Sequence, residues 1–418
     1  MARAPGDAGP PGFIKTAGGP RSRRRRRTRS GGIKTYLDAK ARFATEIGAY
    51  EHHLIVPSAR ERHADGRHGL PGAMVARGNG YRRPLDIRPV LRTLDTIEPD
   101  VILLHDAHWW PAIVANHARE LEAKIVAVHH GSAQAGALGR PGPSAAWRHG
   151  LSAWQRRLYR RVDAVMAVGV PAEASNVPHL PLRYGVAAAF RPPAVRRRDG
   201  HVLYAGRLAP EKGIDVLLRA MVAVDSALDL HLVGCGPAER TPRRQSRRLG
   251  VANRVAFRPF IADARELARA YARAACVVVP GAHETFGLVA LEAAASGASV
   301  VASANVPAAR EAAALVHTFR PGDPDALADA IRCAAAAVPD QLAAARLSAR
   351  MTWPRAFEAE AAALSRLVRY RAARRLPARR VTADAAAMRG HPRLARATRR
   401  RSRDASRHPV RRRYAAAT

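Results

Sequence analysis

Two glutamates stand eight positions apart in the stretch HETFGLVALEAAASG, residues 283–297, which follows the apolar run CVVVP. Glu284 precedes a segment that we expect to be helical from about Phe286 to Ala295, and Glu292 lies inside it. Carboxylates accept hydrogen bonds from hydroxyl groups, often two at once, and the first backbone N–H groups of the segment would face the same ligand: those of Phe286, Gly287 and Leu288. The spacing predicts a binding site for a ligand that carries many hydroxyl groups. The alternative is one helix-start acid and one surface acid, which the Ala- and Leu-rich surroundings of Glu292 disfavour.

Two basic residues follow an apolar strand pattern in VLYAGRLAPEKGIDVLLRAM, residues 202–221. The chain turns at Gly206 and a helix opens near Pro210, so Arg207 lies at a strand end and Lys212 at a helix start. An arginine can donate hydrogen bonds to two oxygens of one anion, and a lysine supplies a mobile point charge. A helix N-terminus also favours anions. This pattern is suited to a diphosphate; the alternative is two solvent-exposed bases in a basic protein.

A Gly-x-Gly pair, Gly234 and Gly236, follows the next strand pattern in LVGCGP, residues 232–237. Glycines at such a place keep side chains away from a ligand that approaches the backbone closely. Because the motif has no third glycine, by itself it indicates only a tight turn.

Short apolar runs alternate with helical patterns in two blocks. The first block, residues 31–190, has buried-strand patterns at 52–57, 100–106, 123–131 and 163–169, with helix-like segments at 111–123 and 153–162. The second block, residues 200–350, has strand patterns at 201–206, 228–234, 254–259, 275–281 and 299–303. Alternating strands and helices predict βαβ units and a parallel sheet in each block. We therefore predict an α/β fold of two Rossmann-like, doubly wound domains, with ligand sites at the carboxyl ends of the strands.

Taken in order, these motifs resemble the retaining glycosyltransferases of family 4. The features concerned are Gly-Arg-x4-Lys-Gly after one strand, Gly-x-Gly-Pro after the next, and Glu-x7-Glu around Phe-Gly. The resemblance spans about residues 31–370 and is strongest from 201 to 303. It implies the GT-B fold, in which two Rossmann-like domains face each other across a cleft.

The resemblance also implies roles for individual residues. The C-terminal domain would hold a nucleotide-sugar donor, with Arg207 and Lys212 on its diphosphate, Glu292 on the ribose and Glu284 on the transferred sugar. Glycines and backbone amides around these side chains would line the donor: Gly31, Gly32, Gly206, Gly234, Gly236, Phe286, Gly287 and Leu288.

A histidine pair ends the strand pattern IVAVHHGS, residues 125–132. The resemblance implies that one of the two contacts the transferred sugar, and strand phase favours His130 over His129. We therefore take His130 and Glu284 as the catalytic candidates. The alternative is that His130 is a structural residue at a strand end.

Neither a metal nor a cofactor is expected besides the nucleotide-sugar co-substrate, because the resemblance implies that basic side chains neutralise the leaving group. Asp323-Pro324-Asp325 has the spacing of a metal-binding pair, but it precedes an Ala-rich helical pattern. Asp323 is therefore predicted to cap that helix, with Pro324 at the first helical position.

The chain departs from the family where the first strand of the first domain should be. The arginine-rich stretch GPRSRRRRRTRS occupies residues 19–30, directly before Gly31. Each unpaired buried charge carries a large desolvation cost, so this stretch cannot form a buried central strand. Either the start or the reading frame of the sequence is wrong, or the strand is missing, and an inactive transferase remnant is one alternative.

The net charge of +36 lies mostly in residues 1–30 and 371–418, which are poor in apolar residues. Both are predicted to be disordered tails. Between them we expect an N-terminal domain at 31–190, a C-terminal donor-binding domain at 191–350 and a closing helix at 351–370. The tails are either simply solvated or attach to anionic lipid or nucleic acid. The basic runs lack interleaved aromatics, which disfavours a nucleic-acid-binding protein.

The three cysteines have no metal or redox spacing, and the start lacks a signal-peptide pattern. No apolar run approaches the ~20 residues of a membrane span. We expect a cytoplasmic protein, with any contact to the inner face of the cell membrane being peripheral. The predicted function is retaining, metal-independent transfer of a sugar from a nucleotide-sugar donor to a saccharide or lipid-linked acceptor in bacterial surface-polysaccharide assembly.

Overall fold

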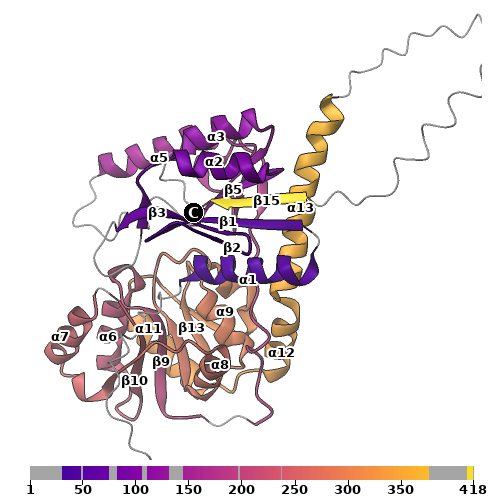
Figure 1. Ribbon diagram of the computed structural model, residues 1–418. Helices are drawn as coiled ribbons and strands as arrows, with labels where there is room; N and C mark the ends of the chain where they lie inside the picture. Colours follow the sequence, from indigo (N-terminus) through magenta and orange to yellow (C-terminus); the bar gives the residue numbers. More distant parts are fainter. Residues whose placement is uncertain are drawn as a thin grey trace, which may run out of the picture.

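The computed structural model describes residues 31–48, 50–74, 82–105, 111–130, 145–195, 198–236, 238–375 and 412–417. These residues form two α/β domains, one above the other in Figure 1. Each domain is built on a largely parallel sheet covered by helices, as the alternating patterns predict. The α/β, two-domain prediction is therefore confirmed.

The N-terminal domain contains a nine-stranded sheet with the order β2-β3-β1-β15-β5-β6-β7-β8, and β4 pairs with β3. Its strands are β1 (Tyr50–Ser58), β2 (Arg62–Ala64), β3 (Arg67–Met74), β4 (Arg82–Pro84), β5 (Val101–Leu104), β6 (Lys124–Val128), β7 (Ala164–Ala167), β8 (His179–Pro181) and β15 (Arg412–Ala417). Its helices are α1 (Gly32–Ile47), α2 (Arg88–Ile97), α3 (Pro111–Glu120) and α5 (Ala145–Tyr159), with a 3-10 turn at Ala172–Ala174. Helix α1 lies on the side of the sheet that faces the C-terminal domain (Figure 1).

The central position of this sheet is filled by β15, from the opposite end of the chain. Strand β15 runs parallel to both neighbours, with Leu54 of β1 opposite Ala416 and Leu103 of β5 opposite the same residue. Two expectations from the sequence are therefore corrected. The sheet has a strand in the position that we expected to be missing, and residues 412–417 are ordered rather than part of a disordered tail. The remaining tail residues, 1–30, 376–411 and 418, lie outside the described residues.

The C-terminal domain contains a six-stranded, fully parallel sheet with the order β11-β10-β9-β12-β13-β14. Its strands are β9 (His201–Arg207), β10 (Asp229–Cys235), β11 (Val255–Arg258), β12 (Cys276–Val279), β13 (Val300–Ser303) and β14 (Val316–Phe319). Its helices are α6 (Ile214–Ala223), α7 (Arg240–Arg248), α8 (Ala264–Arg273), α9 (Leu288–Ala295), α10 (Pro307–Glu311), α11 (Pro324–Ala336) and α12 (Gln341–Arg350). Short 3-10 turns stand at Pro210–Lys212, Ala252–Arg254 and Ala313–Leu315.

Every strand pattern that the sequence predicts corresponds to a strand, with ends displaced by at most three residues. The cap at the start of α11 is also confirmed, because the Asp323 carboxylate accepts from the amides of Asp325 and Ala326. The patterns missed β14, β8, the β2–β4 segment and β15. Strand β14, for example, has only Phe319 fully buried, so it has no continuous apolar run to reveal it.

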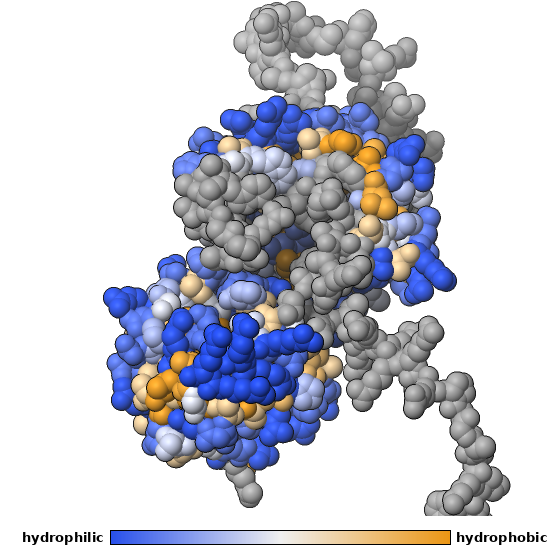
Figure 2. Space-filling view, turned by 90° about the vertical axis from the view of Figure 1, so that its left-hand side faces the viewer, coloured by the Kyte–Doolittle hydropathy of each residue, from blue (hydrophilic) through white to orange (hydrophobic). Residues whose placement is uncertain are grey.

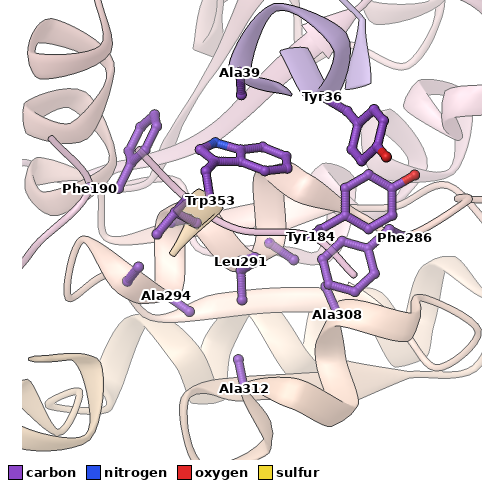
Figure 3. Packing of buried hydrophobic residues seen from close by; sticks show 14 of the residues in the cluster. Tyr36, Ala39, Tyr184, Phe190, Phe286, Leu291, Ala294, Ala308, Ala312 and Trp353 are labelled. Carbon is purple, nitrogen blue, oxygen red and sulfur yellow. The ribbon is translucent and has the colours of Figure 1, made fainter. Parts of the chain in front are cut away.

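The two domains share one hydrophobic core, part of which Figure 3 shows. Helix α13 (Trp353–Arg375) runs along both domains in Figure 1 and continues past residue 370, where we expected it to end. The chain crosses between domains where Gly185 lies against Thr352, and a Cβ on Gly185 would come within 2.3 Å of the backbone there. Only glycine therefore fits at this crossing.

A buried ionic contact fastens α1 to α13. The Glu360 carboxylate accepts from the Tyr36 hydroxyl and pairs with the Lys40 ammonium, and all three side chains are at most 4% exposed. Burial is the main cause that raises the pKa of Tyr36 well above its usual value, and the nearby Glu360 charge is the second. The phenol therefore stays protonated and remains a hydrogen-bond donor. This contact fixes the helix that carries Gly32 relative to the crossing helix.

No helix in the described ranges has both the length and the apolar character needed to cross a membrane.

Candidate functional site

Lys212 and Glu284 meet at the carboxyl ends of β9 and β12. The Lys212 ammonium donates to both carboxylate oxygens of Glu284, at 2.7 and 2.8 Å. Their side chains keep 25% and 15% exposure, so the pair is half-buried but reached by solvent. The structure thus brings together a base and an acid that stand 72 residues apart in the sequence. An anion arriving at Lys212 would compete with Glu284 for the ammonium.

Arg207 stands at the end of β9 and forms an ion pair with Glu211 one turn later. Its side chain is 43% exposed, so it is free to turn toward a ligand at the strand end. The backbone beneath it is fixed, because the buried Tyr204 hydroxyl donates to the Arg207 carbonyl at 2.8 Å. The Tyr204 hydroxyl also lies 3.0 Å from where a Cβ on Gly206 would stand, so a larger residue there would have to displace the Tyr204 side chain.

Gly234 and Gly236 lie against the end of β9 rather than against open space. A Cβ on Gly234 would come within 1.9 Å of the Gly206 carbonyl, and one on Gly236 within 2.0 Å of the Leu208 carbonyl. Gly234 also has φ of 142°, a region that other residues rarely adopt. Close contact between neighbouring strand ends therefore accounts for both glycines, whether or not a ligand lies near them.

Helix α9 begins at Leu288, two residues later than expected, with Gly287 as its N-cap at φ of 88°. A Cβ on Gly287 would come within 2.3 Å of Val306, so the tight entry depends on glycine. Within the described part of the chain, the amides of Phe286, Gly287 and Leu288 donate no hydrogen bond. A helix N-terminus with unused donors attracts negative charge. The arrangement can accept a phosphate or a sugar oxygen.

Glu292 lies in the middle of α9 and touches Tyr271 of α8. Protein surrounds its carboxyl, although part of the side chain still meets solvent. Burial raises the pKa of Glu292 to about 8, and the hydrogen bond from Tyr271 opposes that shift. At neutral pH the carboxyl is therefore mostly protonated, and it can both donate to and accept from a hydroxyl.

On the N-terminal side, His130 follows β6 and contacts two further side chains. Its Nε2 is 2.8 Å from Nδ1 of His105, with the rings stacked at 5.0 Å, and its Nδ1 is 3.4 Å from the Tyr184 hydroxyl. His129 turns the other way and hydrogen-bonds to Tyr159 at 2.7 Å. Burial lowers the pKa of His105 well below its usual value, so this ring is neutral.

Three contacts join the two halves of the site. The Thr285 hydroxyl donates to the His130 carbonyl, which places the residue beside Glu284 directly against the histidine loop. The Tyr184 and Phe286 rings stack at 4.6 Å, as Figure 3 shows. Gly32 lies against the first residue of α9, since a Cβ there would be 3.5 Å from Leu288. The start of α9 and the segment before it thus meet the His130 loop and the start of α1, and Figure 2 shows the molecule hollowed between the domains.

Three participants were missed by the sequence reasoning: His105, Thr285 and the stacking role of Tyr184. His105 lies near the end of the strand pattern DVILLHD, and its place directly after a buried strand was the available signal. Thr285 gives no signal of its own, because its partner is a backbone carbonyl 155 residues away. The stacking of Tyr184 on Phe286 gives no local signal either, because the two rings come from distant parts of the sequence.

Comparison with known proteins agrees with this architecture. Residues 30–173 match the family described as Glycosyltransferase Family 4, and residues 199–336 match Glycosyl transferases group 1. A GDP-mannose-dependent alpha-(1-6)-phosphatidylinositol dimannoside mannosyltransferase of Mycobacterium tuberculosis is 30% identical over 333 residues, which cover 73% of this chain and 84% of that protein. A D-inositol 3-phosphate glycosyltransferase of Thermomonospora curvata is 40% identical over 135 residues, 29% of this chain and 31% of that protein.

Two solved structures show the same fold. Sucrose-phosphate synthase from Thermosynechococcus elongatus superposes with a TM-score of 0.60 at 21% identity, covering 82% of this chain and 94% of that one. Anabaena HepE in complex with UDP-glucose gives 0.60 at 18% identity, covering 81% and 97%. The family matches, the mycobacterial relative and the two facing Rossmann-like domains lead to one conclusion: this chain is a nucleotide-sugar-dependent glycosyltransferase of family 4 with the GT-B fold.

Proposed function

We propose that the chain is a retaining, metal-independent glycosyltransferase that binds its donor against the C-terminal domain. The acceptor is a saccharide or lipid-linked glycan of the bacterial cell surface. The observation that carries the proposal is the Lys212–Glu284 pair, which stands beside the unused amides at the start of α9 and touches the His130 loop through Thr285. Cations, amide donors and sugar-binding acids thus occur within one region.

In this proposal the donor diphosphate lies between Lys212, Arg207 and the start of α9. Lys212 exchanges the Glu284 carboxylate for phosphate oxygens, and Glu284 becomes available to accept from hydroxyls of the transferred sugar. Charge that develops on the leaving diphosphate is stabilised by fixed donors, so no metal is required. The bond between the anomeric carbon and the diphosphate oxygen breaks, and the acceptor oxygen bonds to the same face of that carbon, which retains the anomeric configuration. The leaving diphosphate oxygen takes the proton of the acceptor hydroxyl.

The other residues have positioning roles in the proposal. The protonated Glu292 holds ribose hydroxyls, while His130 contacts the transferred sugar with its ring oriented by His105. Gly31 and Gly32 pass over the phosphates at the start of α1, where Gly32 lies close to Leu288. Because the mycobacterial relative uses GDP-mannose, guanine nucleotide sugars are the first donors to test. The proposed location is the cytoplasm.

The experiment is a thermal-unfolding screen of nucleotide sugars, followed by turnover with the best donor. A donor at a hundred times its dissociation constant adds about 2.7 kcal/mol of stability, which moves the midpoint by several degrees. Glu284→Ala and Lys212→Ala are each expected to reduce turnover by about 10²–10³-fold while remaining folded. Arg219→Ala is the matched control, because Arg219 pairs with Asp215 on the exposed side of α6.

Chelator should leave turnover unchanged, and an α-linked donor should give an α-linked product. Wild-type turnover in both Glu284→Ala and Lys212→Ala would contradict the assigned site. An inverted product, or loss of turnover with chelator, would contradict the proposed reaction while leaving the donor site in place.

A further inference from the structure

Helix α7 carries an unusual density of positive charge. Five of its nine residues are exposed arginines, which we call the α7 arginine face: Arg240, Arg243, Arg244, Arg247 and Arg248. The helix packs through the opposite side, where Pro242 and Ser246 are buried. At 100° per residue, the five arginines span one continuous side of the helix.

Acidic side chains in the described part of the chain balance almost none of this charge. In the described ranges, only Arg243 has an acidic partner, Glu239 at 3.1 Å, and its guanidinium also covers the Phe257 ring at 4.0 Å. Some arginines elsewhere on the same domain are paired along their own helices, such as Arg219 with Asp215 and Arg332 with Asp329. Like charges spaced four residues apart on one helix repel each other. The α7 arginine face therefore produces a strong positive potential, and binding of an external anion would reduce the repulsion.

The position of α7 links this field to the candidate site. The helix follows β10 after Gly236, so its N-terminal end starts close to the strand ends that border the donor region. It lies at the left edge of the C-terminal domain in Figure 1, the side that Figure 2 turns toward the reader. There the lower domain shows a dense hydrophilic area on its outer surface.

We propose that the α7 arginine face docks the enzyme onto an anionic phospholipid surface, so that a lipid-linked acceptor is met at the donor site. The inference rests on the proposed function for its acceptor class. It is favoured over nucleic acid because the reaction partner of a family member with 30% identity is itself a phosphatidylinositol glycolipid, as its name states. Each arginine close to an anionic bilayer adds about 1 kcal/mol of attraction.

The test uses the full chain and vesicles of phosphatidylcholine with and without phosphatidylglycerol. The variant is Arg244→Gln with Arg248→Gln, which removes two charges and keeps good helix formers. The control is Arg265→Gln with Arg269→Gln on α8, an exposed pair with the same spacing and the same change in net charge. The rest of the chain contributes equally to both variants.

We expect the α7 pair to weaken binding to anionic vesicles by on the order of tenfold, and the α8 pair to change it less than about twofold. Hydrolysis of the donor in the absence of vesicles should be equal in both. Equal weakening by the two pairs would show that net charge alone governs binding and would overturn the proposal. So would loss of duplex DNA retention, but not of vesicle binding, in the α7 pair. Absent donor hydrolysis in every variant would instead count against the proposed function.

Discussion

The six strands of the C-terminal sheet come from one stretch of chain, residues 201–319, whereas the N-terminal sheet takes eight strands from residues 50–181 and its central strand from 412–417. The C-terminal domain therefore contains its own complete set of pairings. The N-terminal domain depends on a segment that follows the C-terminal domain in the sequence. The C-terminal sheet thus forms from one continuous stretch of sequence, whereas the N-terminal sheet also needs a distant segment. We therefore expect the N-terminal sheet alone to be destabilised when that segment is removed.

The largest expected effect follows from removing residues 412–418. Without β15, β1 and β5 each lose the strand to which their facing edges are hydrogen-bonded. Buried backbone N–H and C=O groups without hydrogen-bond partners cost stability. We expect amides of β1 and β5 to lose protection from hydrogen exchange, while β9 and β12 keep theirs. Removal of Thr418 alone is the control, because β15 ends at Ala417. Unchanged protection in β5 would show that the two domains do not differ in this way.

The contact between α1 and α13 should also be sensitive. Glu360→Ala leaves the Lys40 ammonium buried without its carboxylate, which costs about 3–5 kcal/mol of unfolding free energy. Urea unfolding measures this loss. Lys40→Met combined with Glu360→Leu should recover most of it, since a buried ion pair can be replaced by packed apolar groups. Asp329→Ala, which breaks an exposed pair on α11, should cost less than about 1 kcal/mol.

His105→Phe separates hydrogen bonding from packing on the N-terminal side of the site. A phenyl ring retains the stacking on the His130 ring but cannot hydrogen-bond to Nε2 of His130. Loss of one hydrogen bond, worth about 1 kcal/mol, predicts turnover lower by roughly five- to tenfold with unchanged donor affinity. Steady-state kinetics with separate kcat and KM values tests this, and His105→Gln, which can still hydrogen-bond, should recover part of the turnover. A change confined to donor affinity would contradict the division of roles between the domains.

Glu292 predicts a smaller, pH-dependent effect in the C-terminal domain. Its pKa is raised to about 8 in the folded protein, above that of an unfolded glutamate. Because the folded state then binds the proton more tightly, this group's contribution to stability is full below about pH 4 and is lost as pH rises toward about 8. Glu292→Gln should therefore flatten the fall in urea midpoint between about pH 5 and about pH 9. An equal fall in both proteins would contradict the assigned pKa.

The sequence predicted most of the C-terminal domain because its signals are local. Buried parallel strands appear as continuous apolar runs, and the turns that carry Lys212 and Glu284 follow directly after them. The N-terminal domain was predicted less fully. Strand β15 has the sequence RRYAAA, which shows neither a β-branched run nor an alternating pattern, and its assignment depends on partners more than 300 residues away. The pairing of Lys212 with Glu284 likewise depends on two loops meeting in space.

The most direct test of the central claim is a calorimetric titration of a nucleoside diphosphate into the wild type, Lys212→Ala and Glu284→Gln. If the diphosphate replaces Glu284 as the partner of Lys212, Lys212→Ala should bind it at least about tenfold more weakly, since charge-assisted hydrogen bonds contribute roughly 1.5–3 kcal/mol. Glu284→Gln should bind it as tightly as the wild type or more tightly, because the competing carboxylate is gone. Unchanged affinity in Lys212→Ala would contradict the account.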